Sequence, residues 1–208
     1  MADAIKKCGA DIVALNEMRD KGSSPEYEAQ TEILSRLTGL EHYYFAKAID
    51  VEGGGPYGNA ILSRFPIESV ETIPIPDPEA KTGTRLYETR CVLKAKLFCG
   101  MTVIVTHFGL NPDEQENAVR TILDSVTDRR CVLMGDFNVR PDNPVLDPIR
   151  ERMLDAASLF DKPMLSFPSD EPTRKIDYVF VSKDINLLSA DIPSIVASDH
   201  RPHVAEII

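Results

Sequence analysis

Seven residues that can do acid–base or metal chemistry stand at or near the ends of apolar runs. They follow the runs DIVAL, TVIVT and CVLMG or lie inside KIDYVFV and ASDHRP; in chain order they are Glu17, His107, Asp136, Asn138, Asp177, Asp199 and His200. Taken singly, each has an ordinary explanation, because Asp and Asn favour turns where strands end. Independent turns seldom place such a set at so many strand ends. The set as a whole therefore indicates a functional site.

The donor atoms of this set indicate a particular chemistry. Its carboxylates and its amide offer oxygen ligands, no cysteine is among them, and hard oxygen donors suit Mg²⁺, Mn²⁺ or Ca²⁺ better than Zn²⁺. A histidine held by an aspartate can act as a general base on water. A metal ion beside a phosphoryl oxygen stabilises developing negative charge. The set predicts a site at which water attacks a phosphate ester.

The elements that must position these residues are many short strands and few helices. Helices are predicted at 2–8, ended by Gly9, at 24–38, ended by Gly39, and at 112–126, capped by Asn111 with Pro112 and Glu114 behind it. The remaining periodic runs predict strands; they cover 11–17, 42–49, 58–64, 70–75, 89–98, 102–108, 130–136, 174–182, 185–192 and 203–208. A short helix or turn is expected at 143–149. This pattern predicts packed sheets with helices outside.

Three segments rich in Pro and Gly are predicted as loops that select the substrate. They are residues 50–58, 74–88 and 162–173, within longer loop-like stretches at 68–84 and 161–173. The start of the 68–84 stretch also fits a strand. Gly135 is expected to keep the backbone slim where the substrate approaches.

Composition and charge narrow the class of protein. The 208 residues, 43% of them hydrophobic, fit one folded domain with a sizeable core. The net charge of −10 argues against non-specific binding of nucleic acid, which relies on Lys and Arg. It is compatible with a phosphate substrate, since bound cations bring their own positive charge. The sequence indicates no obligate protein partner.

The cellular compartment is predicted from the lack of a transmembrane run, from the lack of a signal peptide and from the cysteines. No apolar run approaches the roughly 20 residues of a transmembrane helix, and the first residues lack the apolar core of a signal peptide. The four cysteines, Cys8, Cys91, Cys99 and Cys131, form no CxxC pair, which favours small buried thiols in a reducing compartment over disulfides or zinc. A cytoplasmic location is therefore expected.

Six segments, taken in order, resemble the endonuclease/exonuclease/phosphatase superfamily, the group with the DNase I-like fold. The segments are DIVALNE, GNAILSRFPI, THFGL, GDFNVRPDN, RKIDYVFVS and SDHRPHVAEI. GDFN followed by IDYVFVS and SDHRP at these distances is a highly specific combination. The stretch SFPSDEPTRKIDYVFVS is further similar to bacterial members known only as metal-dependent hydrolases.

The resemblance implies an α/β (α+β) fold, a four-layer α-β-β-α sandwich that forms a single domain over residues 1–208. It implies a Mg²⁺- or Mn²⁺-dependent hydrolase of phosphate esters, in class EC 3.1. Small phosphodiesters, lipid or sugar phosphates and nucleic acid all remain open as substrates, because members of one fold act on all of them.

The resemblance also implies roles for residues that bind metal and phosphate. Glu17 matches the metal-binding glutamate of the family, and Asp199 matches a second aspartate associated with the metal. His107 matches the histidine that hydrogen-bonds the scissile phosphate. Asn138 matches the asparagine that positions the phosphate beside it.

Three further matches concern the attacking water. His200 matches the catalytic base, and Asp177 matches the aspartate that orients it. Asp136 matches the aspartate that orients or activates the nucleophile or protonates the leaving group. Asn59 and Arg90 are predicted to bind substrate, although Asn59 also fits a turn and Arg90 a surface position on a strand.

The sequence departs from the family in two places. Asn16 stands where the family usually has Gln before the metal-binding Glu. Members normally begin with a strand whose Asn supports the metal site, and this sequence starts inside the helix that follows it. An N-terminally truncated domain without that strand, binding metal less tightly than an extended form, is therefore expected. The alternative function is a catalytically silent binding module that keeps the fold.

Overall fold

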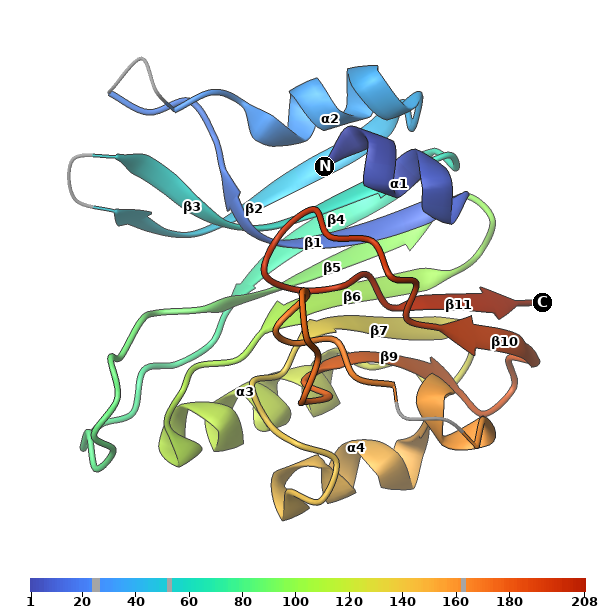
Figure 1. Ribbon diagram of the computed structural model, residues 1–208. Helices are drawn as coiled ribbons and strands as arrows, with labels where there is room; N and C mark the ends of the chain where they lie inside the picture. Colours follow the sequence, from blue (N-terminus) through green and yellow to red (C-terminus); the bar gives the residue numbers. More distant parts are fainter. Residues whose placement is uncertain (24–26, 52–53, 162–163) are drawn as a thin grey trace.

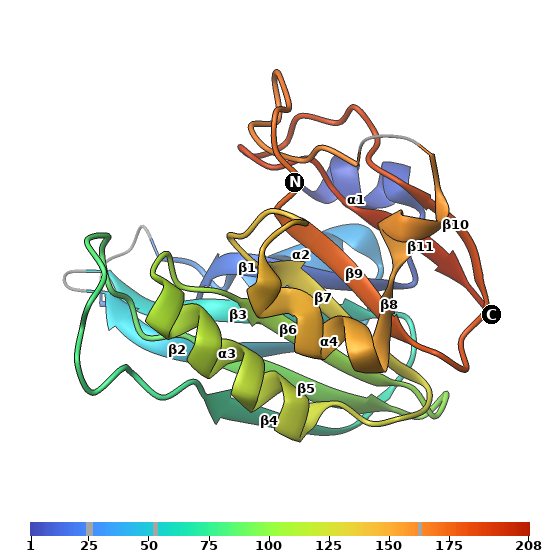
Figure 2. The ribbon, with the colours of Figure 1, turned by 90° about the horizontal axis from the view of Figure 1, so that it is seen from below.

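Two β-layers pack face to face, with helices on both outer sides (Figure 1). The computed structural model describes residues 1–23, 27–51, 54–161 and 164–208. Figure 2 shows the helices α3 (Pro112–Ser125) and α4 (Asp147–Arg152) lying across the outer face of the largest sheet. This order of layers is the α-β-β-α sandwich predicted from the sequence, and the DNase I-like fold class is confirmed.

The largest sheet has six strands in the order β4-β5-β6-β7-β9-β8. Their bounds are β4 Ile67–Pro74, β5 Cys91–Leu97, β6 Thr102–His107, β7 Cys131–Asp136, β8 Met153–Asp155 and β9 Asp177–Ser182. Only β6 and β7 run parallel among these neighbours, because α3 carries the chain back between them. Every residue of β6 is buried, as expected for a central strand covered on both faces.

The second layer contains a three-stranded sheet in the order β1-β3-β2. Its strands are β1 Ile12–Arg19, β2 His42–Val51 and β3 Gly55–Ser63. The helices α1 (Ala2–Cys8) and α2 (Gln30–Thr38) cover its outer face, where Ile5, Leu34 and Leu62 meet in one apolar cluster. Gly9 and Gly39 end these helices in the left-handed conformation, as predicted.

A separate pair of strands, β10 (Leu187–Asp191) and β11 (Val204–Ile207), completes the second layer. Alternate residues of β9 face opposite cores: Tyr178 and Phe180 face the helices α3 and α4, whereas Val179 and Val181 face a cluster with Ile185. The β10-β11 pair therefore packs on the inner face of the six-stranded sheet, as the three-stranded sheet does.

Two predicted boundaries differ from the structure because tertiary contacts decide them. The helix expected from residue 24 begins at Gln30; residues 24–26 lie outside the described part, and the Tyr27 ring packs against the Arg19 guanidinium. The predicted loop at 50–58 is largely a hairpin, in which β2 runs to Val51 and β3 starts at Gly55. Residues 52–53 of that loop lie outside the described part.

Other sequence-based expectations can be compared directly with the fold. The stretch 68–84 begins with most of β4, as its strand-like start indicated, and the three-residue strand β8 was not predicted. All four cysteines are free, and Cys91 and Cys131 are buried. Within the described ranges, no helix has the length and apolar character that crossing a membrane requires.

Candidate active site

Three neighbouring strands carry a titratable residue at the same edge of the six-stranded sheet. The parallel pairing of β6 and β7 sets His107 opposite Asp136. The antiparallel pairing of β7 and β9 sets Asp136 opposite Asp177. Because residues in register share one face of a sheet, strand pairing alone gathers these side chains into one row. His107 and Asp136 are 4% and 7% exposed, so the row is largely shielded from water.

His200 joins this row from the loop between β10 and β11. Its Nδ1 lies 2.8 Å from Asp177 Oδ2, and its Nε2 lies 3.9 Å from Asp136 Oδ2. The Ser166 hydroxyl donates a second hydrogen bond, 2.5 Å long, to the same Oδ2 of Asp177. The Phe167 ring packs against the imidazole of His200 with centroids 4.8 Å apart. Since an ionised carboxylate only accepts, Nδ1 of His200 is the donor and Nε2 is directed toward the row.

The partners of His107 fix its protonation state. Arg90 Nη1 lies 3.1 Å from His107 Nδ1, and a guanidinium can only donate, so Nδ1 must accept. Burial, followed by the charges of Arg90 and His200, holds the pKa of His107 well below its usual value. His107 is therefore neutral at pH 7 with its proton on Nε2, which lies 3.5 Å from Asp136 Oδ2.

The turn after β7 fixes the carboxylate of Asp136. Asn138 adopts a left-handed φ of 52°, and its backbone N–H donates to Asp136 Oδ1 at 2.8 Å. Its side-chain amide donates to the carbonyl of Phe108 at 3.0 Å. One oxygen of Asp136 is thus held by the backbone, and the other faces both imidazoles.

Gly135, just before this turn, has a φ of +147°. A Cβ at Gly135 would lie 1.9 Å from the carbonyl oxygen of Thr106 on β6. The close approach of the neighbouring strand therefore requires glycine here, a reason different from the expected approach of substrate.

Two asparagines link the sheets directly beneath the row. The Asn16 side-chain amide donates to Asn59 Oδ1 at 2.7 Å and to the Thr106 carbonyl at 2.9 Å. Its own Oδ1 accepts the backbone N–H of Asp136 at 3.0 Å. Asn59 is 2% exposed and donates to the carbonyl of Cys91 at 2.9 Å. Both ends of the Asn59 amide are thus engaged within the protein.

The charges of the row displace two pKa values. Burial raises the pKa of Asp136 to about 7, with help from the charge of Asp177, while His200 opposes the rise. Burial by itself lowers the pKa of His200, but the hydrogen bond and charge of Asp177, with the charges of Asp136 and Asp199, outweigh it and raise this pKa to about 9. Four carboxyl groups, those of Glu17, Asp136, Asp177 and Asp199, thus act on this site around the single imidazole of His200, so negative charge is in excess there.

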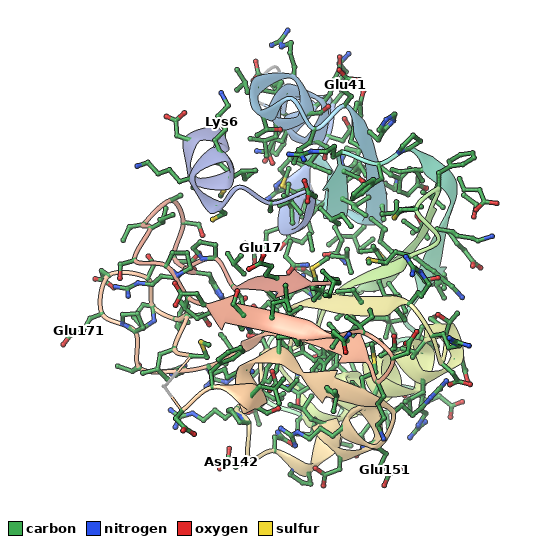
Figure 3. All side chains as sticks on the ribbon, turned by 90° about the vertical axis from the view of Figure 1, so that its right-hand side faces the viewer. Lys6, Glu17, Glu41, Asp142, Glu151 and Glu171 are labelled. Atoms are coloured by element: carbon green, nitrogen blue, oxygen red, sulfur yellow. The ribbon has the colours of Figure 1, made fainter. Side chains whose placement is uncertain are left out.

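Glu17 and Asp199 lie at the exposed rim of the site. Glu17 lies in a bulge of β1 and has a left-handed φ of 58°. Figure 3 shows its side chain between the ribbon of β1 and the C-terminal strands. Its charge contributes to the raised pKa of Asp136, and that of Asp199 acts on His200. In the part of the chain that the structure describes, no three His, Cys, Asp or Glu residues are close enough together to form a ready metal cluster.

The donor chemistry of the rim nevertheless fits a divalent cation. Glu17 offers an exposed carboxylate beside a row that already holds excess negative charge. Oxygen donors and unbalanced negative charge are what Mg²⁺ and Mn²⁺ bind. Glu17 and Asp199 are therefore the residues best placed to hold such an ion.

The structure brings together residues from seven segments of the chain. His107, Asp136, Asn138, Asp177 and His200 form the row and its turn, Glu17 and Asp199 form the rim, Asn59 lies beneath, and Arg90 lies behind His107. Ser166 was missed from the sequence, where a lone Ser in a loop gives no signal. Asn16 was noted only as a departure from the family, yet it links both sheets to Asp136.

Comparisons with known proteins identify the family of this chain. The sequence profile of the Endonuclease/Exonuclease/phosphatase family matches residues 1–200. The Uncharacterized protein YbhP of Escherichia coli K12 is 26% identical over 238 aligned residues, which span all of this chain and 87% of that protein.

Two solved structures share the fold across the whole chain. A mannosyl-6-phosphatase of Bacteroides thetaiotaomicron is 15% identical with a TM-score of 0.78, covering 100% of this chain and 88% of that one. An endonuclease/exonuclease/phosphatase of Beutenbergia cavernae is 24% identical with a TM-score of 0.75, covering 99% of this chain. This chain spans 64% of the length of the Beutenbergia protein.

Proposed function

Because this chain belongs to the endonuclease/exonuclease/phosphatase family, whose members are generally phosphoesterases, we propose that it hydrolyses phosphate esters by direct attack of water. One observation carries the proposal: His200, held by Asp177 at 2.8 Å, presents Nε2 to the buried row of His107 and Asp136. An imidazole held in this way beside donors for an anion is suited to activating water.

His200 is the general base in this mechanism. Asp177 fixes the tautomer with the proton on Nδ1, and Ser166 fixes the orientation of Asp177. In its neutral form, a minority species below its pKa of about 9, Nε2 of His200 takes a proton from the attacking water. As the new P–O bond forms, the P–O bond to the leaving group breaks, and the leaving oxygen takes a proton from solvent. Asp136 Oδ2, which lies 3.9 Å from that Nε2, orients the same water from the other side.

Neutral hydrogen-bond donors, rather than charged side chains, hold the phosphate group in this mechanism. His107 carries its proton on Nε2 and donates it to a phosphoryl oxygen. Asn138 places its amide beside the same group, with one of its two N–H bonds committed to the Phe108 carbonyl. Fixed donors of this kind stabilise the charge that develops in the transition state. Arg90 and Asn59 act as positioning residues, Arg90 through His107 and Asn59 through Asn16.

Members of this family generally use divalent metals, and Glu17 with Asp199 would hold the ion here. A bound Mg²⁺ or Mn²⁺ supplies charge neutralisation and polarises the phosphoryl group. Because the row carries excess negative charge, these residues also attract the cation before substrate binds.

A small phosphate ester is the substrate that the charge supports best. The net charge of −10 disfavours long nucleic acid, whose binding relies on basic surface. A mannosyl-6-phosphatase shares the fold, so sugar phosphates are the first substrates to test. Nuclease activity is an outcome that the same assays can detect.

The proposal is tested with bis(p-nitrophenyl) phosphate and p-nitrophenyl phosphate, each with Mg²⁺, with Mn²⁺ and with EDTA. Turnover with a metal, abolished by EDTA and by His200→Ala, is expected. Binding of phosphate without turnover of either ester, under every condition, would identify a silent binding module instead.

A further inference from the structure

A column of alternating cationic and aromatic side chains leads away from His107. It consists of Arg90, Tyr57, Arg19 and Tyr27, here called the arginine column. Arg90 Cζ lies 5.9 Å from the centroid of the Tyr57 ring, and Arg19 Cζ lies 4.8 Å from the same centroid and 5.2 Å from that of Tyr27. The column starts at Arg90, which contacts Nδ1 of His107, and reaches the end of β1, two residues beyond Glu17.

The two arginines of this column differ in what neutralises them. Arg90 Nη1 pairs with Glu88 Oε1 at 2.6 Å and donates to His107. None of the ion pairs between described residues includes Arg19. Nη1 of Arg19 is buried and has no hydrogen-bond partner. Arg19 as a whole is half-buried, and a buried N–H donor without an acceptor costs free energy, so the unpaired Nη1 is unfavourable in the ligand-free protein.

The packing around Arg19 holds the guanidinium in place. A Cβ at Gly54 would lie 2.5 Å from the Tyr27 ring, so the β2–β3 hairpin closes tightly on that ring. Tyr57, the other aromatic neighbour, is 8% exposed. Arg19 is thus pre-organised before any ligand binds, which lowers the entropic cost of binding one.

The ligand that fits this group is an anion. Cation–π contacts engage the face of a guanidinium, whereas its N–H donors lie in the plane and match two oxygens of a phosphate. Stacking of a nucleobase is less suitable, because Arg19 already covers both tyrosine rings. That no described residue forms an ion pair with Arg19 is also notable in a chain with a net charge of −10.

We propose that Arg19 binds a second phosphate group of the substrate while the first is cleaved beside His107 and Asp136. This inference rests on the proposed phosphoesterase function and adds a substrate class, small esters that carry two phosphates. Arg19 is a specificity-determining residue in this scheme, and Tyr27 and Tyr57 position it.

The test is competition against hydrolysis of p-nitrophenyl phosphate with Mg²⁺. Fructose 1,6-bisphosphate is compared with fructose 1-phosphate and fructose 6-phosphate, and adenosine 3′,5′-bisphosphate with adenosine 5′-monophosphate. At least one bisphosphate should inhibit about tenfold more tightly than its monophosphates, the usual contribution of a charged hydrogen-bonded pair. Arg19→Met should remove this advantage and leave inhibition by monophosphates within about twofold.

Controls separate this inference from the proposed function. Arg120→Met, on the exposed face of α3, should preserve the advantage of the bisphosphate. Arg19→Gln replaces Arg19→Met if melting temperatures show that the latter does not fold. Equal inhibition by mono- and bisphosphates in the unaltered protein, or an equal loss for both in the Arg19 variant, overturns the inference. If p-nitrophenyl phosphate is not hydrolysed, the same ligand pairs are compared by calorimetry, so loss of turnover and loss of the second-phosphate site are distinct results.

Discussion

The two sides of the candidate site are built differently. On the strand side, the register of neighbouring strands fixes His107, Asp136 and Asp177, and the first two are buried. On the rim, Glu17 and Asp199 are exposed, one on a bulge and one in a loop. The groups proposed to transfer the proton and to bind the phosphate are thus already in position in the folded protein. Groups suited to a cation are left free, because an ion organises its own ligands when it binds.

Substitutions on the strand side are expected to lower kcat the most. His200→Ala and Asp136→Ala should each lower kcat by roughly a thousandfold, as losing a general base or its partner generally does. Steady-state kinetics with saturating Mg²⁺ measures this, and circular dichroism checks the fold. If both variants keep their activity, the strand side is not the catalytic side.

Substitutions at the rim should change activity mainly by weakening the binding of the metal ion. Glu17→Gln keeps the shape of the side chain and removes its charge, so the Mg²⁺ concentration for half-maximal activity should rise at least about tenfold. The kcat at saturating Mg²⁺ should change much less. Glu68→Gln, at an exposed site on β4 where Glu68 pairs with Lys96, is the matched control. An unchanged Mg²⁺ requirement in the Glu17 variant would remove Glu17 from the proposed metal site.

Substitution of Ser166 tests whether catalysis depends on the fixed geometry of the strand side. Ser166→Ala removes one of two hydrogen bonds to Asp177 Oδ2, so kcat should fall about five- to tenfold, the equivalent of roughly 1 kcal/mol. Ser166→Thr retains the hydroxyl and should recover part of the loss. Full activity in Ser166→Ala would show that Asp177 orients His200 without this support.

The last effect is on stability rather than on activity, and it concerns a second histidine behind the strand side. Nδ1 of His203 lies 3.2 Å from the Asp177 carbonyl, and burial, with the charge of Lys175, lowers its pKa to about 4. The unfolded chain binds this proton near pH 6.5. The stability from neutral His203 is therefore present above pH 6.5 and is lost as the pH falls toward 4, an effect on the order of 2 kcal/mol.

Urea unfolding at pH 7 and pH 4.5 measures this contribution. His203→Gln removes the titrating group and should flatten the pH dependence relative to the unaltered chain. His42→Gln, on β2, should leave the dependence unchanged. An identical slope in the His203 variant would contradict the assigned cause.

Local patterns predicted most of the framework, because the forces that set them act between residues close in sequence. The cap of α3 is an example: the Asn111 backbone N–H donates to Glu114 Oε2 at 3.1 Å, as the spacing of these two residues indicates. The start of α2 was misplaced because the contacts of Tyr27 are with Arg19 and Gly54, which no local pattern reveals.

The sequence by itself determined the fold class and the chemical types of the site residues. Apolar runs and their end residues are properties of short segments, and they carry the resemblance to the family. Only the tertiary structure decided how these residues are used. In the folded protein Asn59 is a buried link between the sheets, Arg90 contacts His107, and Nη1 of Arg19 is buried without a hydrogen-bond partner among the described residues. Those outcomes depend on strand pairing and on sheet-to-sheet packing, which join residues far apart in the chain.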